Sequence, residues 1–194
     1  MKKILALLLI ACVAFAFAAC KDDGETAVDV SSFTAAIAAT NPDGSVITVK
    51  TTTAIGDLNA TYTVVYNEDG SAVVTYEVEQ FNEFDPTNPE GETKSVVNGT
   101  VNLAADGSYT GDALSGNVAD IAAGVSVDLT AVADKATVNE AGDILTVVVP
   151  AADTAAVIGT AVASDVTLVI TVSGSVVEQI NISYTGTVIE CKYN

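Results

Sequence analysis

The chain has 194 residues, 25 acidic and seven lysine side chains, a formal net charge of −18, and no histidine, arginine or tryptophan. Nucleic-acid binding is excluded, because phosphate recognition needs Lys or Arg and a field of this sign repels a polyanion. A Ser-His-Asp or Cys-His catalytic site cannot be built without histidine. A glycosidase needs only two carboxylates, but sugar sites commonly use aromatic platforms, which six Tyr and five Phe supply sparsely. We therefore expect no enzymatic activity, no metal and no cofactor.

The first twenty residues have the organisation of a secretory signal. Lys2 and Lys3 precede an apolar run over residues 4–17, and small residues then lead to Cys20. This order is typical of signal peptides, and the apolar run is too short to span a membrane comfortably. We predict a signal peptide at 1–19, a polar tether at 20–27 and a single β-rich domain at 28–194.

Residues 17–20, Phe-Ala-Ala-Cys, resemble the lipobox of bacterial lipoproteins, although Phe17 stands where that motif usually carries an aliphatic residue. The resemblance implies that Cys20 is acylated and anchors the protein to a membrane in the cell envelope, outside the cytoplasm. Residues 16–18, Ala-Phe-Ala, also fit an ordinary signal peptidase site. In that alternative Cys20 stays free, and a disulfide with Cys191 becomes possible in an oxidising compartment. We otherwise expect Cys191 to be a small hydrophobic residue in a terminal strand.

Two segments have the pattern of short helices. Residues 31–39 begin with two serines suited to an N-cap and end before Asn41-Pro42, and Phe33, Ala36 and Ile37 form one apolar stripe. Residues 150–159 place Pro150 at a helix start and Gly159 at the position of a C-cap. Both helices are too short to be stable alone, so we expect them to pack on a sheet.

Alternating apolar and polar residues predict half-buried antiparallel strands. The alternation covers residues 58–66, 74–79, 125–130, 166–172 and 176–184, and the last segment places Val176, Glu178, Ile180, Ile182 and Tyr184 on one face. Asp-Gly-Ser at 43–45, 69–71 and 106–108 predicts tight turns, because Gly accepts the positive φ that hairpin turns require. Residues 139–143 predict a further turn, joining strands at 135–138 and 144–149.

Residues 82–92 form an unusually long connection after a strand that ends near Phe81. Glu83, Asp85, Glu90 and Glu92 are carboxylates of the kind that hold a divalent cation. The alternatives are a solvated acidic loop and a cation-binding protein. The Asp-Gly-Ser turns lack the ligand spacing of an EF-hand, so we interpret them as turns and not as calcium loops.

The predicted fold is mainly antiparallel β with two short helices, as a curved sheet or open half-barrel wrapping a helix; the alternative is an immunoglobulin-like β-sandwich. The order of elements over residues 28–190 resembles the lipoprotein carriers of the LolA/LppX type, without a shared specific motif. The resemblance implies an apolar pocket for acyl chains. The residues that would contact an apolar ligand are Tyr62, Val64, Tyr66, Val74, Tyr76 and Val78; in the alternative they are core.

These patterns favour a membrane-anchored, non-enzymatic lipoprotein that binds an apolar or lipidic ligand. Two alternatives remain open. One is a structural or adhesive surface protein without a small ligand, and the other is the acidic cation-binding protein described above.

Overall fold

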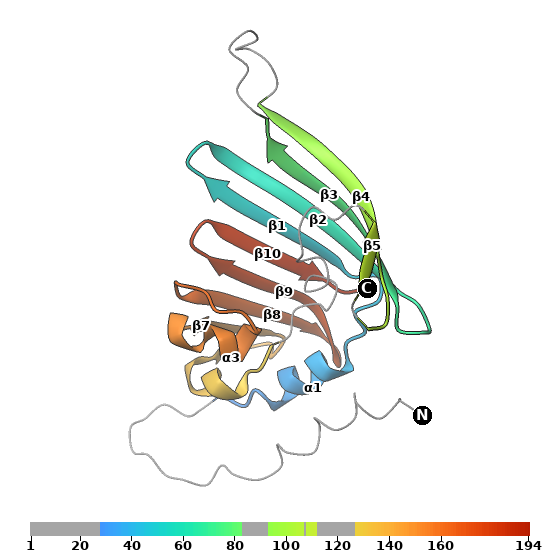
Figure 1. The fold of residues 1–194 in the computed structure, drawn as a ribbon. Helices are drawn as coiled ribbons and strands as arrows, with labels where there is room; N and C mark the ends of the chain where they lie inside the picture. The colour runs from blue at the N-terminus through green and yellow to red at the C-terminus, as the bar shows by residue number, and fades with distance from the viewer. Residues whose placement is uncertain (1–27, 83–92, 107, 112–126) are drawn as a thin grey trace.

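The computed structural model describes residues 28–82, 93–106, 108–111 and 127–194, and these residues build one antiparallel sheet (Figure 1). The strands are β1 (Val46–Thr53), β2 (Gly56–Tyr66), β3 (Ala72–Phe81), β4 (Lys94–Leu103), β5 (Tyr109–Gly111), β6 (Thr137–Val138), β7 (Ile144–Val149), β8 (Val166–Ser173), β9 (Val176–Tyr184) and β10 (Thr187–Lys192). Their order across the sheet is β5-β4-β3-β2-β1-β10-β9-β8-β7-β6, with every pair antiparallel. The expected curved, open antiparallel sheet is confirmed, and the sandwich alternative is wrong because the ten described strands form a single sheet.

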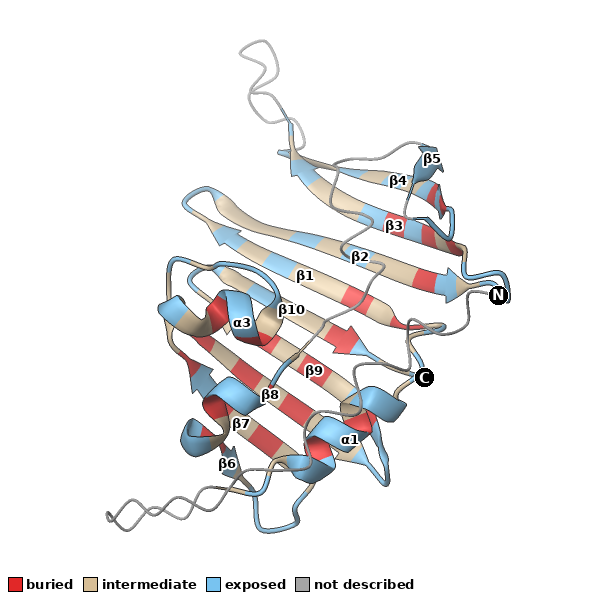
Figure 2. Cartoon of the chain, turned by 60° about the horizontal axis from the view of Figure 1, so that its bottom comes forward, coloured by how far each residue is buried: buried red, intermediate tan, exposed pale blue. Residues whose placement is uncertain are grey.

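The helices gather over one half of the sheet. They are α1 (Ser31–Ala39), the 3₁₀ helices η1 (Thr130–Lys135) and η2 (Ala151–Asp153), and α3 (Thr154–Ile158). α1 contacts β9 and β8, η1 contacts β7, and α3 contacts η1 and η2. Figure 2 shows these helices in front of β7, β8 and β9, whereas among the described residues no helix covers β2, β3 and β4. The helices therefore cover the half of one sheet face that β7, β8 and β9 form.

Both helices predicted from the sequence are present. α1 has the predicted bounds, and its Phe33 and Ala36 are buried against the sheet. Its first turn is not capped by a serine, however, because the Asp29 carboxylate accepts a hydrogen bond from the Ser31 amide at 2.9 Å. The second helix follows Pro150 as η2 and α3, and it ends at Gly159 in the left-handed conformation that favours glycine.

The strand predicted over residues 125–130 is wrong in its described part. Residues 127–129 are not in a strand, and η1 begins at Thr130. The Asp128 carboxylate accepts hydrogen bonds from the Thr130 amide at 2.9 Å and the Thr130 hydroxyl at 2.6 Å. This local side-chain hydrogen bonding competes with a strand ladder and starts a turn instead. Leu129 and Val132 are buried in the core.

The predicted apolar face of residues 176–184 needs one correction. Val176 is exposed and Val177 is buried, the reverse of strict alternation, whereas Ile180 and Ile182 are buried as predicted. The register between β8 and β9 shifts here, since Thr171 pairs with Gln179 and Val172 with Val177. The extra residue is a β-bulge, which reverses the face of the side chains on one side of it.

The predicted Asp-Gly-Ser turns are present where they are described. In the turn between β2 and β3, the Asp69 carboxylate accepts the Ser71 amide at 2.9 Å and the Ser71 hydroxyl at 2.6 Å, while Gly70 adopts a φ of 83°. Asp106 and Ser108 repeat these hydrogen bonds at the same lengths between β4 and β5. The turns fix the hairpin register, and with it the face that each strand residue presents.

The two faces of the sheet differ in chemistry. The inner face carries the helices and most of the buried residues, including Leu145, Leu168, Ile170 and Ile180, each at most 1% exposed. The outer face carries Thr, Asn and charged side chains, such as Thr61, Thr75 and Glu77 on the paired strands β2 and β3, together with exposed valines such as Val65, Val96 and Val188. The core therefore lies on the inner face, below α1, η1 and α3.

Candidate apolar binding face

The six residues predicted to contact an apolar ligand all lie on the inner face of β2 and β3. The register pairs Tyr62 with Tyr76 and Val64 with Val74, and strand alternation places Tyr66 and Val78 on the same face. Val64, Val74 and Tyr76 are buried in the core cluster, whereas Tyr62, Tyr66 and Val78 are half-buried and pack against it. The set is therefore contiguous, with a buried centre at Val64, Val74 and Tyr76 and half-buried residues around it.

Gly99 of β4 makes room for the Tyr76 ring. The two residues are paired across β3 and β4, and a Cβ atom added to Gly99 would lie 2.7 Å from Cε1 of Tyr76 and closer still to its hydroxyl end. Real Cβ atoms do not approach ring atoms this closely. The Tyr76 ring therefore lies over the Gly99 backbone, where it is only 5% exposed. Glycine in a strand often marks such a close approach.

Beyond this tyrosine pair, a row of apolar residues crosses five strands and remains half exposed. Cross-strand pairing connects the members of this row in the order Ile189, Val49, Ala60, Val78 and Val97. We call these five residues the apolar row. All five are intermediate in exposure, whereas Leu168, on the β8 part of the same face, is fully buried. The apolar row thus continues the hydrophobic core to a surface that the described residues cover incompletely.

An uncharged polar rim follows the apolar row. One step further along the strands on the inner face lie four neutral polar residues, Thr187, Thr51, Gln80 and Ser95, with the apolar Leu58 of β2 as the exception. The Gln80 side-chain amide donates to the Ser95 hydroxyl at 3.4 Å. Along the strands, the inner face therefore changes from buried apolar side chains to half-covered apolar ones and then to neutral polar ones.

Two tyrosines of this face, Tyr62 and Tyr66, have hydroxyl groups that are neutral. Burial raises the pKa of Tyr62 above its ordinary value, and the neighbouring Tyr76 raises it further. Burial likewise raises the pKa of Tyr66. Both phenols consequently keep their protons at neutral pH and can donate as well as accept a hydrogen bond.

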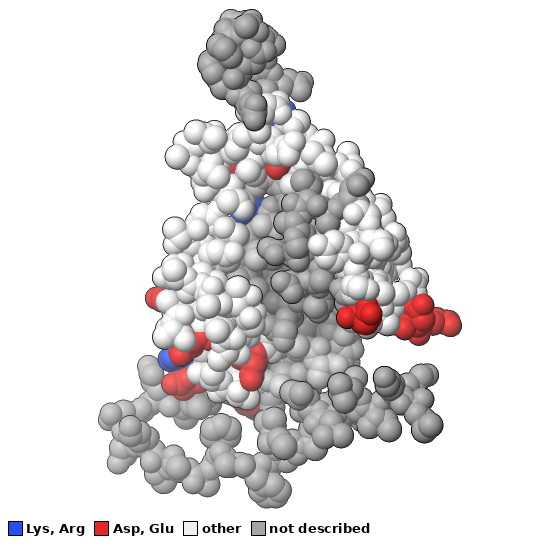
Figure 3. Space-filling model, viewed as in Figure 1, with Lys and Arg blue, Asp and Glu red and all other residues white. Residues whose placement is uncertain are grey.

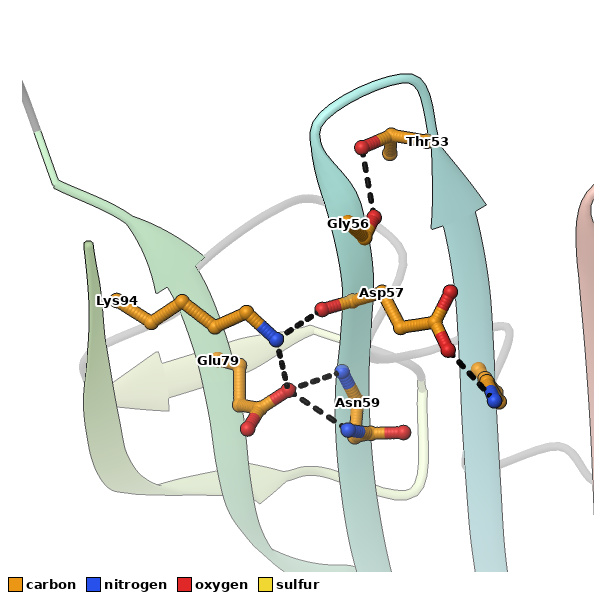
Figure 4. Close-up of polar contacts among 7 residues, drawn as sticks. Thr53, Gly56, Asp57, Asn59, Glu79 and Lys94 are labelled. Atoms are coloured by element: carbon orange, nitrogen blue, oxygen red, sulfur yellow. Dashed lines mark hydrogen bonds and ion pairs between the residues drawn. The ribbon is translucent and has the colours of Figure 1, made fainter.

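The backbone ladder between β2 and β3 ends at the apolar row. Ala60 and Val78 form the last pair, although β2 continues to Gly56 and β3 to Phe81. Side chains on the outer face replace the missing ladder bonds (Figure 4). The Glu79 carboxylate accepts the Asn59 amide at 2.8 Å and the Asn59 side chain at 2.7 Å, and the Lys94 ammonium donates to the Asp57 carbonyl.

Two side chains of this bridge, Lys94 and Glu79, carry opposite charges. Lys94 Nζ lies 3.7 Å from Glu79 and 5.8 Å from the centre of the Phe81 ring, which lies under the ammonium as in a cation–π contact. Hydrogen bonds from the Asn59 amide and then its side chain lower the pKa of Glu79, and Lys94 lowers it further. The bridge joins the start of β2 to the end of β3 and the start of β4 behind the apolar row.

Among the described residues, most acidic side chains lie away from the inner face. On the side shown in Figure 3 they gather on the turns and around the helices. The acidic residues of the described turns are Asp43, Glu68, Asp69, Asp106, Glu140 and Asp143. Every inner-face position of the described strands is uncharged.

The remaining sequence predictions differ in outcome. Cys191 lies in β10 as predicted, fully buried, and burial raises the pKa of its thiol. Cys20, the signal peptide at 1–19 and the tether at 20–27 lie outside the described residues, as do Glu83, Asp85, Glu90 and Glu92 of the acidic connection. The described part of the chain contains no group of three or more potential metal ligands. None of its helices is long and apolar enough to cross a membrane.

The sequence prediction named only Val78 of the apolar row as a ligand contact. It placed Ala60 on the apolar face of its strand but not among the contacts, and it included neither Val49 and Ile189 of β1 and β10 nor Val97 and Gly99 of β4. The signal was present, since Val97, Gly99, Val101 and Leu103 alternate with Asn98, Thr100 and Asn102. Glycine at the second of these positions concealed it, because glycine weakens the pattern of a strand.

Comparisons with known proteins identify no family. No family description matches the sequence, and no curated protein is similar to it. Among solved structures, the crystal structure of LprF from Mycobacterium bovis is similar over 84% of this chain and 90% of that chain, with 12% sequence identity and a TM-score of 0.36. A similarity at this level carries no argument about function. The class that the structure defines is an open antiparallel sheet with short helices over half of its inner face.

Proposed function

We propose that the protein is an extracytoplasmic, membrane-anchored lipoprotein that binds an apolar or lipidic ligand on the inner face of its sheet and catalyses no reaction. The observation that carries this proposal is the apolar row of Ile189, Val49, Ala60, Val78 and Val97. It continues the core of the protein, yet every member is only partly buried among the described residues. Ligand sites in proteins are mostly apolar and carry a few convergent polar groups.

The polar groups of the face fit the same function. Tyr62 lies next to Ala60 of the apolar row on the same face, and Gln80 with Ser95 lies at the rim of the row. Such groups orient a ligand whose remaining surface is hydrocarbon. The N-terminal Cys20, if acylated, would keep this face close to a lipid source.

The proposal is tested by filling the apolar row at its centre. In Ala60→Tyr, the new side chain lies between Val49 and Val78, its neighbours on the paired strands. Thr61→Tyr is the matched control, because Thr61 is the next residue of β2 and points to the outer face, where it is exposed. Both variants add a tyrosine to the same strand, and circular dichroism verifies that both are folded.

The assay is a fluorescence titration with Nile red, an uncharged dye whose emission increases in an apolar site. We expect saturable binding to the parent protein, unchanged binding to Thr61→Tyr, and at least about tenfold weaker binding to Ala60→Tyr, since overfilling a packed apolar site costs about 1–3 kcal/mol. Equal binding to all three proteins would place the dye elsewhere and overturn the proposal.

A further inference from the structure

The lysines of the described strands all lie on the outer face of the sheet. The described residues include Lys50, Lys94, Lys135 and Lys192. Lys50, Lys94 and Lys192 extend from outer-face positions of β1, β4 and β10, and Lys135 lies in η1. No lysine of the described strands points to the inner face.

Each of these four lysines is already paired with a carboxylate. Lys50 lies 2.7 Å from Asp57, and Lys192 lies 2.7 Å from Glu190. Lys135 lies 3.2 Å from Asp153, and Lys94 takes part in the bridge to Glu79 described above. A ligand on the inner face therefore meets no cation that the described sheet could offer it.

The rest of the sequence contains few cationic residues. The chain has no arginine or histidine, and its other lysines are Lys2, Lys3 and Lys21, all before the described domain. The segments 83–92 and 112–126 contain carboxylates and no cationic residue. The described strands therefore offer an anionic head group on the inner face no cationic partner, in a chain whose net charge is −18.

We propose that the apolar face selects uncharged amphiphiles, meaning a hydrocarbon chain that ends in a hydroxyl or ester group, and rejects lipids with a phosphate or carboxylate head group. This inference rests on the proposed function. The apolar row holds the chain, and the neutral rim of Thr51, Gln80 and Ser95 faces the head group. Hydroxyl and amide groups satisfy a neutral head group by hydrogen bonds, whereas they do not offset the desolvation of an anion.

Two lipids that differ only in a phosphate test this selectivity. Mono-oleoylglycerol has a free glycerol head group, and oleoyl lysophosphatidic acid is the same molecule with a phosphate added. Each displaces Nile red from the protein in a competition titration at neutral pH, below its micelle-forming concentration. We expect the neutral lipid to bind at least about tenfold more tightly, because a charge placed in an apolar site without a partner is strongly penalised.

A cation placed at the rim should remove the selectivity. Ser95→Lys introduces an ammonium at the end of the apolar row, and Val96→Lys is the control, because Val96 is the next residue and is 51% exposed on the outer face. We expect Ser95→Lys to bind the phosphate lipid at least about tenfold more tightly than the parent does, as a charge-assisted pair forms, and Val96→Lys to behave as the parent.

The outcomes separate the inference from the function beneath it. If the parent protein binds the phosphate lipid as tightly as the neutral lipid, or more tightly, the selectivity is overturned while lipid binding stands. If the parent binds neither lipid, the proposed function itself falls, and the selectivity falls with it. A gain in Val96→Lys equal to that in Ser95→Lys would show a general charge effect and would also overturn the assignment of the rim.

Discussion

The packing of Tyr76 over Gly99 predicts that Gly99→Ala destabilises the protein. The new Cβ atom would lie 2.7 Å from a ring carbon of Tyr76, which is 5% exposed and packed among core residues, so the ring must move. Overpacking of this kind costs about 1–3 kcal/mol. Replacing glycine by alanine restricts the unfolded chain, which offsets about 0.4–1 kcal/mol of that cost.

The expected net loss is therefore about 1–2 kcal/mol in the free energy of unfolding, or a decrease of about 2–8 °C in Tm for a chain of this size. Circular dichroism during urea and thermal unfolding measures both quantities. Asn98→Ala is the control, because this neighbour of Gly99 in β4 is exposed on the outer face. Surface substitutions usually change stability by less than about 0.5 kcal/mol.

A second variant isolates the contact itself. In a Tyr76→Leu background the ring is absent, so Gly99→Ala should cost less than it does in the parent, with a coupling energy of about 1–2 kcal/mol. If Gly99→Ala is as stable as the parent, or equally harmful in both backgrounds, the reasoning about the Tyr76 ring is refuted.

Four further predictions follow from the same structure. Leu168→Ala removes a fully buried side chain and should lower the free energy of unfolding by about 2–5 kcal/mol, as measured by urea denaturation; a loss below about 1 kcal/mol would contradict the core assignment. Lys94→Met removes the donor to the Asp57 carbonyl and should lower the free energy of unfolding by about 0.5–1.5 kcal/mol. The Asn59 backbone amide should then exchange its hydrogen faster, and an unchanged exchange rate there would contradict the prediction. Hydrogen bonds from Ser71 and Ser108 lower the pKa values of Asp69 and Asp106. The stability that these two carboxylates contribute is therefore present above the ordinary carboxyl pKa and is lost as the pH falls through their pKa values in the folded protein. The double variant Asp69→Asn with Asp106→Asn should lose less stability on acidification than the parent, and an unchanged slope of stability against pH would reject this. The Cys191 thiol, buried and raised in pKa, should react with a thiol reagent far more slowly in the native protein than in urea, and equal rates would contradict its burial.

Much of the sheet was predictable because its strands carry regular alternation and its turns carry specific chemistry. Tyr62 to Tyr66 and Val74 to Val78 face the core as their spacing requires, and Gly70 takes the positive φ that its turn needs. Local signals of this kind survive folding when tertiary contacts agree with them.

The failures have local physical causes. Alternation placed Leu129 in a strand, but the Asp128 side chain binds the Thr130 amide and turns the chain into η1. Alternation also placed Val176 on the apolar face. A bulge in β9 instead leaves Val176 exposed and buries Val177 there. A bulge depends on pairing with another strand, so no single segment reveals it.

The candidate site was predictable only in part. The sequence indicated that Tyr62, Tyr76 and their neighbours share a face, but it did not show which of them are covered. That depends on the strand order, which places β10, β1 and β4 beside them and brings in Ile189, Val49 and Val97. Ile189 lies far from Val78 in the chain, so its membership of the apolar row is a property of the fold.

The central claim is that the inner face of β1–β4 and β10 binds lipid, and paramagnetic relaxation by a spin-labelled monoacylglycerol tests it most directly. Valines on both faces of the same strands provide the comparison in one methyl spectrum. We predict strong broadening of the Val49, Val78 and Val97 methyl signals and little change for Val96 and Val188, which are exposed on the outer face. Equal broadening on both faces, or broadening confined to the outer face, would contradict the account.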